Sequence, residues 1–532
     1  MGALGFALLL LCGDLEKDRA ELKKAAAAVD LRGVRDAAER LAGSDKKAAV
    51  DALLDGYGIC AGAIKILWGE KLKAHQQKEA NADFRINMAT NPPTIVQGDE
   101  KKYEAWLEAE ALGQRTETKI MQVEACKRAI VDGLGSFKSD ETVKELTAEL
   151  AKNAAPAKRA GIAEALGRLS HATIPPALAE VAHKDAEPPV RVAALDALRE
   201  LKADEGAPAA IEGLKHEFWQ VRSAAAALLR ALKARTGVEP LVDALTKADG
   251  RLRAEFNDAL AAITGVDKHG DPAAWKAWLE ANRAAVLDGS YLPRPEEAAG
   301  GGPSGKTTFY GIPVESKSVI FILDRSGSML EPSEWEVPQE VATGPGAPGV
   351  DVKKTGDRKI DIARWQLKRA LAMMPDGAEF NLIFYNHEWT ILSEKPLKLS
   401  TSTRKTAFEF IDRLEPMGPT NIYDPLEKGL SFAATGLMMD KIAKSGVDTI
   451  FFLTDGMPNT GQVPRAEDIL VKVKELNKSR KVKIHAIGVF SSGRGPQTAM
   501  SESELGGKFL QKLAEENGGR YTGSRKKAAE SK

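Results

Sequence analysis

The sequence predicts a multidomain chain in which an all-α N-terminal part precedes a C-terminal α/β domain with a doubly wound, mainly parallel sheet. The all-α part is expected to be a helical region followed by an α-solenoid. Three observations support this fold class. The N-terminal part is rich in Ala, Leu, Glu, Lys and Arg, a period of 31 to 32 residues follows it, and apolar strands then alternate with amphipathic helices. The length of 532 residues also exceeds what one hydrophobic core usually organises.

Charge and cysteine content exclude several function classes. Lys plus Arg and Asp plus Glu each number 75, so no overall charge attracts nucleic acid or an anionic membrane, and we expect no nucleic-acid partner. The three cysteines, Cys12, Cys60 and Cys126, show no CxxC spacing, which argues against a zinc site and a disulfide framework. A single bridge between Cys60 and Cys126 stays open.

Residues 1–13 resemble the apolar core of a signal peptide, which favours an extracytoplasmic location, secreted or periplasmic. The apolar run from Ala3 to Cys12 is too short to span a bilayer, and no later segment is a transmembrane candidate. No Lys or Arg precedes the run, however, and Leu11 stands where a lipoprotein signal has a small residue. The alternative is the apolar start of a buried helix in a cytoplasmic protein.

Residues 14–135 are predicted to form helices in a bundle or loose coiled coil, because good helix formers dominate and long stretches lack Pro. The stretch 90–99, which contains Asn91-Pro92-Pro93, breaks the pattern and is expected to be a loop between helices. Nothing in this region indicates a specific role.

A repeat follows, anchored on four arginines that are 32, 31 and 31 residues apart: Arg159, Arg191, Arg222 and Arg253. Apolar residues stand seven and ten positions after each anchor: Leu166 and Leu169, Leu198 and Leu201, Leu229 and Leu232, Leu260 and Ile263. These offsets place them on one helical face, and a short apolar helix precedes three of the anchors. Each unit is therefore a helix pair that must stack on its neighbours to bury its apolar face.

This spacing resembles that of short HEAT repeats, as do three pairs of residues, Val190-Arg191, Val221-Arg222 and Leu252-Arg253. The resemblance implies a solenoid over residues 139–283 that offers a surface for protein contacts. Its last helix follows Asp271-Pro272, and Trp275 and Trp278 are expected to close the end of the stack. The alternative is an irregular Ala-rich bundle with a chance period.

Residues 284–315 are rich in Gly, Pro, Ser and Glu and are predicted to be an interdomain linker. Within them, residues 300–307 match the pattern GxxxxGK[ST] of a phosphate-binding loop, which requires a buried strand before it and a helix after it. Pro295-Glu296 precedes the motif, and Gly311 and Pro313 follow it, so neither flank fits. We expect no nucleotide site here, and a linker NTPase is kept only as an alternative.

Residues 316–524 are predicted to be the α/β domain, ahead of a tail at 525–532. Strands are expected at 318–323, 380–385, 447–454, 482–489 and 520–522. Helices are expected to begin near Lys359 and to span 403–414, 424–434, 466–476 and 508–517. In sheets of this kind ligands bind beyond the carboxyl ends of the strands, so functional side chains are sought there.

Three predicted loops at that edge carry oxygen ligands. Asp324, Ser326 and Ser328 follow the first strand, Asp455 follows the strand at 447–454, and Thr420 lies just before a helix. Two carboxylates and three hydroxyls form a hard-oxygen set suited to Mg²⁺ or Mn²⁺, with Ca²⁺ as a further option, and poor for zinc. Such residues also serve as ordinary cap and turn residues, which is the alternative.

The order of these motifs resembles the metal-ion-dependent adhesion site of the von Willebrand factor type A (VWA) family, written DxSxS, then Thr, then Asp. The resemblance implies that Asp324, Ser326, Ser328 and Thr420 bind the metal directly or through water and that Asp455 usually acts through water. An acidic residue of a protein partner would complete the coordination. The family likeness thus implies non-enzymatic, metal-dependent adhesion.

The predicted domain departs from the family pattern at residues 330–357, an insertion rich in Glu, Pro and Gly that separates the DxSxS turn from its helix. Its position beside the metal site allows it to shape partner choice. Its composition equally fits a disordered surface loop.

Two histidines in the predicted α/β domain are candidate catalysts. His485 lies inside a predicted strand and is expected to be a packed or hydrogen-bonded core residue, whereas His387 follows a strand and lies nearer the site. Neither stands at a recognisable spacing from a nucleophile, so we expect no enzyme. The alternatives are a scaffold in which only the solenoid binds and the metal is structural, and a metal-assisted hydrolase.

Overall fold

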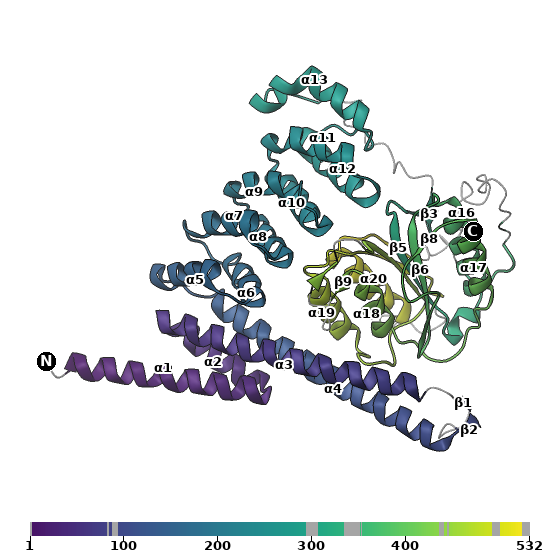
Figure 1. Ribbon diagram of the computed structural model, residues 1–532, viewed down its shortest axis with the longest axis horizontal. Coiled ribbons are helices and arrows are strands. Elements are labelled where there is room, and N and C mark those ends of the chain that lie inside the picture. The colour runs from purple at the N-terminus through teal and green to yellow at the C-terminus, as the bar shows by residue number, and fades with distance from the viewer. Residues whose placement is uncertain are drawn as a thin grey trace, which may run out of the picture. The chain divides into compact units, whose positions relative to one another are not determined.

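The computed structural model describes residues 3–81, 84–87, 94–293, 307–334, 352, 354–435, 441–443, 446–491 and 501–523. Within them the chain forms two compact units, one mainly of the N-terminal helices and one mainly of the residues after the segment 294–306 (Figure 1). The predicted fold class is confirmed, because the first unit is helical and the second contains a mainly parallel sheet.

The helical unit begins with four long helices, α1 (Ala3–Ala28), α2 (Leu31–Ser44), α3 (Lys47–Ala80) and α4 (Glu100–Leu134). Helices α3 and α4 pack along each other (Figure 1), and a buried ion pair joins them, with Lys71 Nζ 2.7 Å from Glu117 Oε2. A buried pair of this kind favours one register of the two helices, because any slip leaves a charge unpaired.

The prediction of a loop at 90–99 is only partly correct. Residues 94–98 form strand β2 (Thr94–Gly98), which pairs antiparallel with β1 (Phe84–Asn87), and residues 88–93 lie outside the described residues. The sequence Thr94-Ile95-Val96 consists of β-branched residues, a composition that is typical of strands.

Two further predictions concern the N-terminal segment and a possible disulfide bond. Residues 3–13 belong to helix α1, and their role as a signal peptide stays a prediction. Cys60 and Cys126 are buried free thiols, so the bridge left open by the sequence is absent. Among the described helices, none combines the length and the apolar character needed to cross a bilayer.

Four helix pairs follow, and Figure 1 shows them stacked in a row: α5 (Asp140–Lys152) with α6 (Pro156–Leu166), α7 (Ile174–Lys184) with α8 (Pro188–Leu201), α9 (Ala207–Gly213) with α10 (Trp219–Leu232), and α11 (Val238–Lys247) with α12 (Gly250–Thr264). Short 3₁₀ turns, η1 (Asp204–Gly206) and η2 (Arg235–Gly237), lead into α9 and α11. The leucines seven residues after each anchor are fully buried, which confirms the predicted solenoid.

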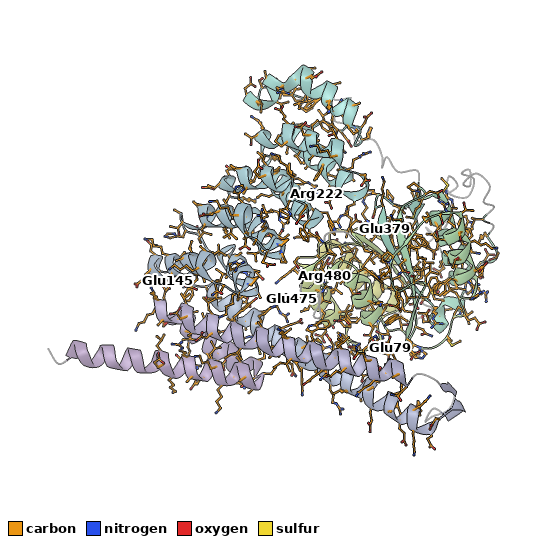
Figure 2. The ribbon with its side chains drawn as sticks, viewed as in Figure 1. Glu79, Glu145, Arg222, Glu379, Glu475 and Arg480 are labelled. Atoms are coloured by element: carbon orange, nitrogen blue, oxygen red, sulfur yellow. The ribbon has the colours of Figure 1, made fainter. Side chains whose placement is uncertain are left out.

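The anchoring arginines have a common structural task. Each lies in the first turns of the second helix of its pair and donates to a main-chain carbonyl just after the first helix: Arg159 to Asn153 (2.9 Å), Arg191 to Asp185 (2.5 Å), Arg222 to His216 (2.8 Å) and Arg253 to Ala248 (2.9 Å). Figure 2 labels Arg222 on α10. The guanidinium groups thus satisfy carbonyls that a helix end leaves without partners, which explains the period in physical terms.

The predicted closing helix is α13 (Pro272–Asp288). Asp271 caps it, because its Oδ1 accepts from the main-chain nitrogens of Ala273 and Ala274 at 2.8 and 3.3 Å. The Trp275 ring is completely buried, its Nε1 donates to Asn257 Oδ1 at 2.8 Å, and the Trp278 ring meets it edge-on at 5.3 Å. The tryptophans therefore close the apolar end of the stack as expected.

The α/β unit contains a seven-stranded sheet among its described residues, in the order β13-β12-β11-β5-β6-β7, with β8 also on β6. The strands are β5 (Ser318–Asp324), β6 (Glu379–Tyr385), β7 (Trp389–Ile391), β8 (Leu397–Lys398), β11 (Thr449–Thr454), β12 (Lys483–Gly488) and β13 (Tyr521–Gly523). From β13 to β6 every pairing is parallel, and β7 and β8 run antiparallel to β6. A separate short pair joins β9 (Ala434–Thr435) to β10 (Lys441–Ile442).

Helices cover both faces of this sheet (Figure 1): α16 (Lys359–Met373) and α17 (Thr401–Asp412) on one side, and α18 (Tyr423–Ser431), α19 (Ala466–Asn477) and α20 (Glu502–Glu516) on the other. Alternate residues of β5 serve the two faces. Phe321 packs in the core with α16. Ile322 points to the other face and lies against α18, since a Cβ added to Gly429 of that helix would come within 2.8 Å of it. Helix α20 begins at Glu502, earlier than the expected 508, because Ser501 and Glu504 form a capping box.

The end of the predicted linker is part of this unit. Within 284–315, β3 (Thr308–Phe309) pairs antiparallel with β4 (Ile312–Pro313), and Phe309 and Tyr310 are buried in the core. Residues 300–306 of the phosphate-loop pattern lie outside the described residues, but Thr307 is followed by strand β3. The helix that such a loop requires is therefore absent at this position, as expected.

Candidate functional site

The candidate site lies where the order of the sheet reverses. The chain passes from β5 to β6 on one side, whereas β11, which comes later, pairs with β5 on the other. Loops after two such strands diverge and leave a crevice at the carboxyl edge, where ligands bind in doubly wound sheets. Asp324 ends β5 and Asp455 follows β11 at this edge, while Glu379, labelled in Figure 2, begins β6 at the opposite edge.

The first carboxylate is held by two hydrogen bonds. Asp324 is fully buried, and its Oδ1 accepts from the main-chain nitrogen of Ser326 at 2.7 Å. Its Oδ2 accepts from Thr454 Oγ1 at 2.7 Å. The 3₁₀ turn η3 (Gly327–Leu330) then redirects the chain, so that Ser326 and Ser328 lie at the same edge. The carboxylate is thus fixed in orientation before any ligand arrives.

The second carboxylate gathers the two serines. Ser328 Oγ donates to Asp455 Oδ1 at 2.8 Å, Ser326 Oγ lies 3.5 Å from the same oxygen, and the two hydroxyls are 3.2 Å apart. Four of the five predicted ligands therefore meet in one hydrogen-bonded group. Their polar atoms are all oxygens, as a hard divalent cation requires.

Thr420 reaches the same edge on its own loop. The main-chain nitrogen of Gly327 donates to Gly418 O at 3.1 Å, which ties this loop to the DxSxS turn. Thr420 itself exchanges two bonds with Asn459, through Thr420 N to Asn459 Oδ1 (2.8 Å) and Asn459 N to Thr420 O (3.1 Å). A Cβ built on Gly456 would lie 3.7 Å from Thr420 Oγ1, which places this hydroxyl next to the Asp455 loop.

Gly418 is required for this approach. Its φ of +71° lies in the left-handed region, and a Cβ there would come within 2.8 Å of His387 Nδ1. His387 thus lies beside the loop, as expected from its position after a strand.

The buried carboxylates of the site favour binding of a cation. Burial, and then the nearby charge of Asp455, raise the pKa of Asp324 to about 7. A divalent cation between the carboxylates would offset both causes, and the hydroxyls of Ser326, Ser328 and Thr420 supply neutral oxygens beside them. The residues present therefore fit Mg²⁺ or a similar ion. Among the described residues, no group of three or more His, Cys, Asp or Glu side chains suits a metal.

A pH dependence follows from the Asp324 carboxyl. Below pH 7 a proton occupies it in the metal-free fold and would compete with an ion held at this site, so any affinity for Mg²⁺ should fall about tenfold per pH unit. Above pH 7 the affinity should level off. Isothermal titration calorimetry between pH 5.5 and 8.5 measures this, and an affinity that stays constant below pH 7 would contradict it.

The metal-free protein should show the opposite trend in stability. Between about pH 4 and pH 7 the folded state retains a proton on Asp324 that the unfolded chain has lost. The contribution of this group to the free energy of unfolding therefore decreases as pH rises through that window. Urea titrations with and without Mg²⁺ test this, because bound cation should cancel the loss.

One residue of the site was missed by the sequence patterns. Lys359, the first residue of α16, is 2% exposed, and its Nζ lies 2.8 Å from Asp455 Oδ2 and 2.7 Å from Glu331 Oε2. The ion pair, together with a bond from Ser491, lowers the pKa of Glu331. A lysine at the start of a helix opposes the helix dipole, and this mismatch is the signal that could have revealed it.

Main-chain bonds bring Lys359 to the site across the predicted insertion. Residues 335–351 and 353 lie outside the described residues, but the two ends of the insertion meet. Pro332 forms a β-bridge with Arg358, Ser333 N donates to Asp357 O at 2.8 Å, and Lys359 N donates to Glu331 O at 2.9 Å. The DxSxS turn and helix α16 are therefore adjacent despite the residues between them.

His485 is a core residue, as expected. It stacks on Phe451 with ring centroids 4.7 Å apart, and its Nδ1 accepts from the main-chain nitrogen of Arg520 at 3.0 Å. Burial, followed by the charge of Lys483, lowers its pKa to about 3, so the ring is neutral at physiological pH.

Comparison with known families supports the interpretation of the helical unit. A family model for HEAT repeats matches residues 123–199 and 175–261. Over these residues the stacked helix pairs are therefore similar to HEAT repeats. The match starts within α4 and ends within α12, so the HEAT repeats coincide with the stacked helix pairs and their anchoring arginines.

Comparison with curated proteins finds similarity over about two fifths of the chain. The chain is 26% identical over 245 residues to the human inter-alpha-trypsin inhibitor heavy chain H4, a match covering 44% of this chain and 22% of that protein. It is 25% identical over 218 residues to the human von Willebrand factor A domain-containing protein 3A, covering 41% and 14%. The chain thus spans less than a quarter of the length of these relatives.

Two solved structures show similarity to about two fifths of the chain. They are a von Willebrand factor type A protein from Catenulispora acidiphila (TM-score 0.27, 18% identity, 40% of each chain) and the PilB minor pilin from Streptococcus sanguinis (TM-score 0.26, 18% identity, 38% of this chain and 56% of that one). By sequence, the chain is thus similar to HEAT repeats in its helical unit and to a von Willebrand factor A domain-containing protein over 41% of its length.

Proposed function

We propose that the α/β unit holds a divalent cation, Mg²⁺ or alternatively Mn²⁺ or Ca²⁺, at a metal-ion-dependent adhesion site. Its ligands are Asp324, Ser326, Ser328, Thr420 and Asp455. Through this cation the protein binds an acidic side chain of a partner protein. The observation that carries the proposal is the convergence of these oxygens from three separate loops at the switch point of the sheet.

The chain's own residues prepare the site for a carboxylate. Hydrogen bonds from Ser326 N and Thr454 Oγ1 hold Asp324 in place, and Ser328 does the same for Asp455. When bound, the cation supplies the positive charge that attracts the partner's carboxylate. Hydroxyls beside it add no negative charge, so that attraction is not cancelled.

The rim of the site adds a second criterion for the partner. Leu330, at the end of the DxSxS turn, and Met417, beside Gly418, are 45% and 50% exposed. Large apolar side chains at a rim favour contact with apolar side chains of a partner. We therefore propose a partner that presents an acidic residue among apolar ones.

The HEAT repeats provide a second interaction surface in this proposal, and no catalysis is assigned to either unit. Nucleotide hydrolysis that disappears in Lys306→Ala would contradict the non-enzymatic part of the proposal. Hydrolysis by the purified chain that persists in that variant but requires Mg²⁺ would favour a metal-assisted hydrolase instead.

The test is capture of partner proteins by the immobilised full chain with Mg²⁺ and with chelator. We expect bound partners to be lost about tenfold or more when Mg²⁺ is removed or when Asp324 is changed to Ala. The matched control is Asp412→Ala on α17, whose carboxylate is exposed and pairs with Lys368. Asp412→Ala should bind like the unmodified chain.

A second candidate function is a scaffold in which only the solenoid binds partners. The HEAT-repeat match favours it, because stacked helix pairs form extended protein-binding surfaces. In that case the same captured proteins would remain after addition of chelator and in Asp324→Ala. Calorimetry on the full chain would then show whether the α/β unit takes up Mg²⁺ at all.

A further inference from the structure

The starting observation is a buried ammonium group inside the candidate metal site. The Lys359 side chain is 2% exposed, and its Nζ bridges Asp455 Oδ2 at 2.8 Å and Glu331 Oε2 at 2.7 Å. The Asp455 side chain is fully buried, whereas that of Glu331 is 53% exposed. The ammonium therefore has one inner and one outer carboxylate partner.

This lysine is poorly placed for stability alone. As the first residue of α16 it puts a positive charge at the positive end of the helix dipole, and its burial adds a desolvation cost. Within the part of the chain that the structure describes, the charges that offset these costs are the two carboxylates. The local main chain also aims it there, because Lys359 N donates to Glu331 O at 2.9 Å.

The charges of the site can be counted directly. Without Lys359, a divalent cation would be neutralised by Asp324 and Asp455, and an incoming carboxylate would leave the site negative. Among the buried groups, the ammonium on Asp455 then leaves the same cation with one positive charge in excess, which one incoming carboxylate removes. The half-exposed Glu331, screened by solvent, offsets only part of this excess.

We propose that Lys359 is a resident counter-cation of this site, one that weakens binding of the metal alone and strengthens binding of an acidic ligand to the metal-loaded protein. The inference rests on the proposed function, since it concerns the same five ligands. Glu331 lies on the solvent side of Lys359 and partly neutralises the ammonium. It therefore determines how much of the charge of Lys359 acts on the metal ligands.

Two substitutions should shift metal affinity in opposite directions. Lys359→Met keeps most of the side-chain length and removes the charge, so the dissociation constants for Mg²⁺ and Mn²⁺ should fall about tenfold or more. Glu331→Gln removes the outer negative charge from Lys359, so more of its positive charge acts on the metal ligands and the dissociation constants should rise. Both are measured by isothermal titration calorimetry on the full chain, with Lys368→Met on the same helix as the control that should change nothing.

A second readout separates this role from a structural one. Acetate serves as the carboxylate probe, and its binding to Mn²⁺-loaded protein is followed by water proton relaxation. We expect Lys359→Met to bind Mn²⁺ more tightly but acetate more weakly. Its metal-free melting temperature should be lower, and Mg²⁺ should restore it, because the cation then takes over the neutralisation of Asp455.

The outcomes distinguish the two levels of the proposal. If neither the unmodified chain nor any variant takes up metal, the proposed function fails. If the unmodified chain binds metal but Lys359→Met binds it equally or more weakly, only the role of Lys359 is overturned. Should Lys359→Met not fold without metal, Glu331→Gln still decides, since unchanged or tighter metal binding in it contradicts the inference.

Discussion

Asp324→Asn should abolish Mg²⁺ uptake and at the same time stabilise the metal-free protein. The amide has the shape of the carboxylate, so its Oδ1 can still accept from Ser326 N. Its Nδ2 can donate to Thr454 Oγ1, whose own proton can turn to Gly456 O at 3.3 Å. The buried negative charge is gone, which removes the cost reflected in the raised pKa of Asp324.

The size of the stability gain depends on pH. At pH 8 the metal-free carboxyl is ionised in the fold, and its replacement should increase the free energy of unfolding by roughly 1–3 kcal/mol. At pH 5 it is protonated in the fold, and the gain should be smaller. Urea unfolding at both pH values measures this, and calorimetry measures Mg²⁺ uptake. Retained Mg²⁺ binding, or lower stability at pH 8, would contradict the assignment of Asp324.

Trp275→Ala should produce the largest loss of stability in the helical unit, about 3–5 kcal/mol. The Trp275 ring is completely buried at the end of the solenoid, and the substitution leaves a cavity beside Trp278. It also removes one of the donors to Asn257 Oδ1, whose other donor is the main-chain nitrogen of Gly270 at 2.8 Å. Terminal repeats have a neighbour on one side only, so this end should unfold first.

The measurement is urea unfolding of the full chain followed by circular dichroism at 222 nm, with limited proteolysis to locate the opening. Leu287→Ala on the same helix is the matched control, because that side chain is 50% exposed and should change stability little. A Trp275→Ala protein that unfolds within about 1 kcal/mol of the unmodified chain would mean that α13 does not close the core.

The sequence predicted those parts of the fold that repeat or that follow a strand. The arginine period could be recognised because each guanidinium has the same function. It donates to a main-chain carbonyl that has no helical partner after the first helix of a pair. Asp324 and Asp455 were readable because apolar strands end at them, and parallel strands bring their carboxyl ends to one edge.

Other features depend on contacts that no short pattern reports. The strands β3 and β4 have two residues each, too few for an alternation, and the Gly-Pro composition around them favoured a linker. The hairpin of β1 and β2 was obscured in the same way by Asn91-Pro92-Pro93. From the sequence, Lys359 would be taken for a surface residue at the start of a helix. Its position facing Asp455 depends on the β-bridge between Pro332 and Arg358, which the sequence does not reveal.

That meeting of Pro332 and Arg358 also makes the site tolerant of changes in chain length. A loop whose two ends are already fixed side by side costs little more to close when it is lengthened, since doubling its length adds only about 0.6 kcal/mol. Evolution can therefore vary, shorten or replace the intervening stretch without disturbing the oxygens next to it. For the experimenter, Pro332 and Arg358 mark the points between which a fluorophore or an epitope tag can be introduced to test the proposed ion site.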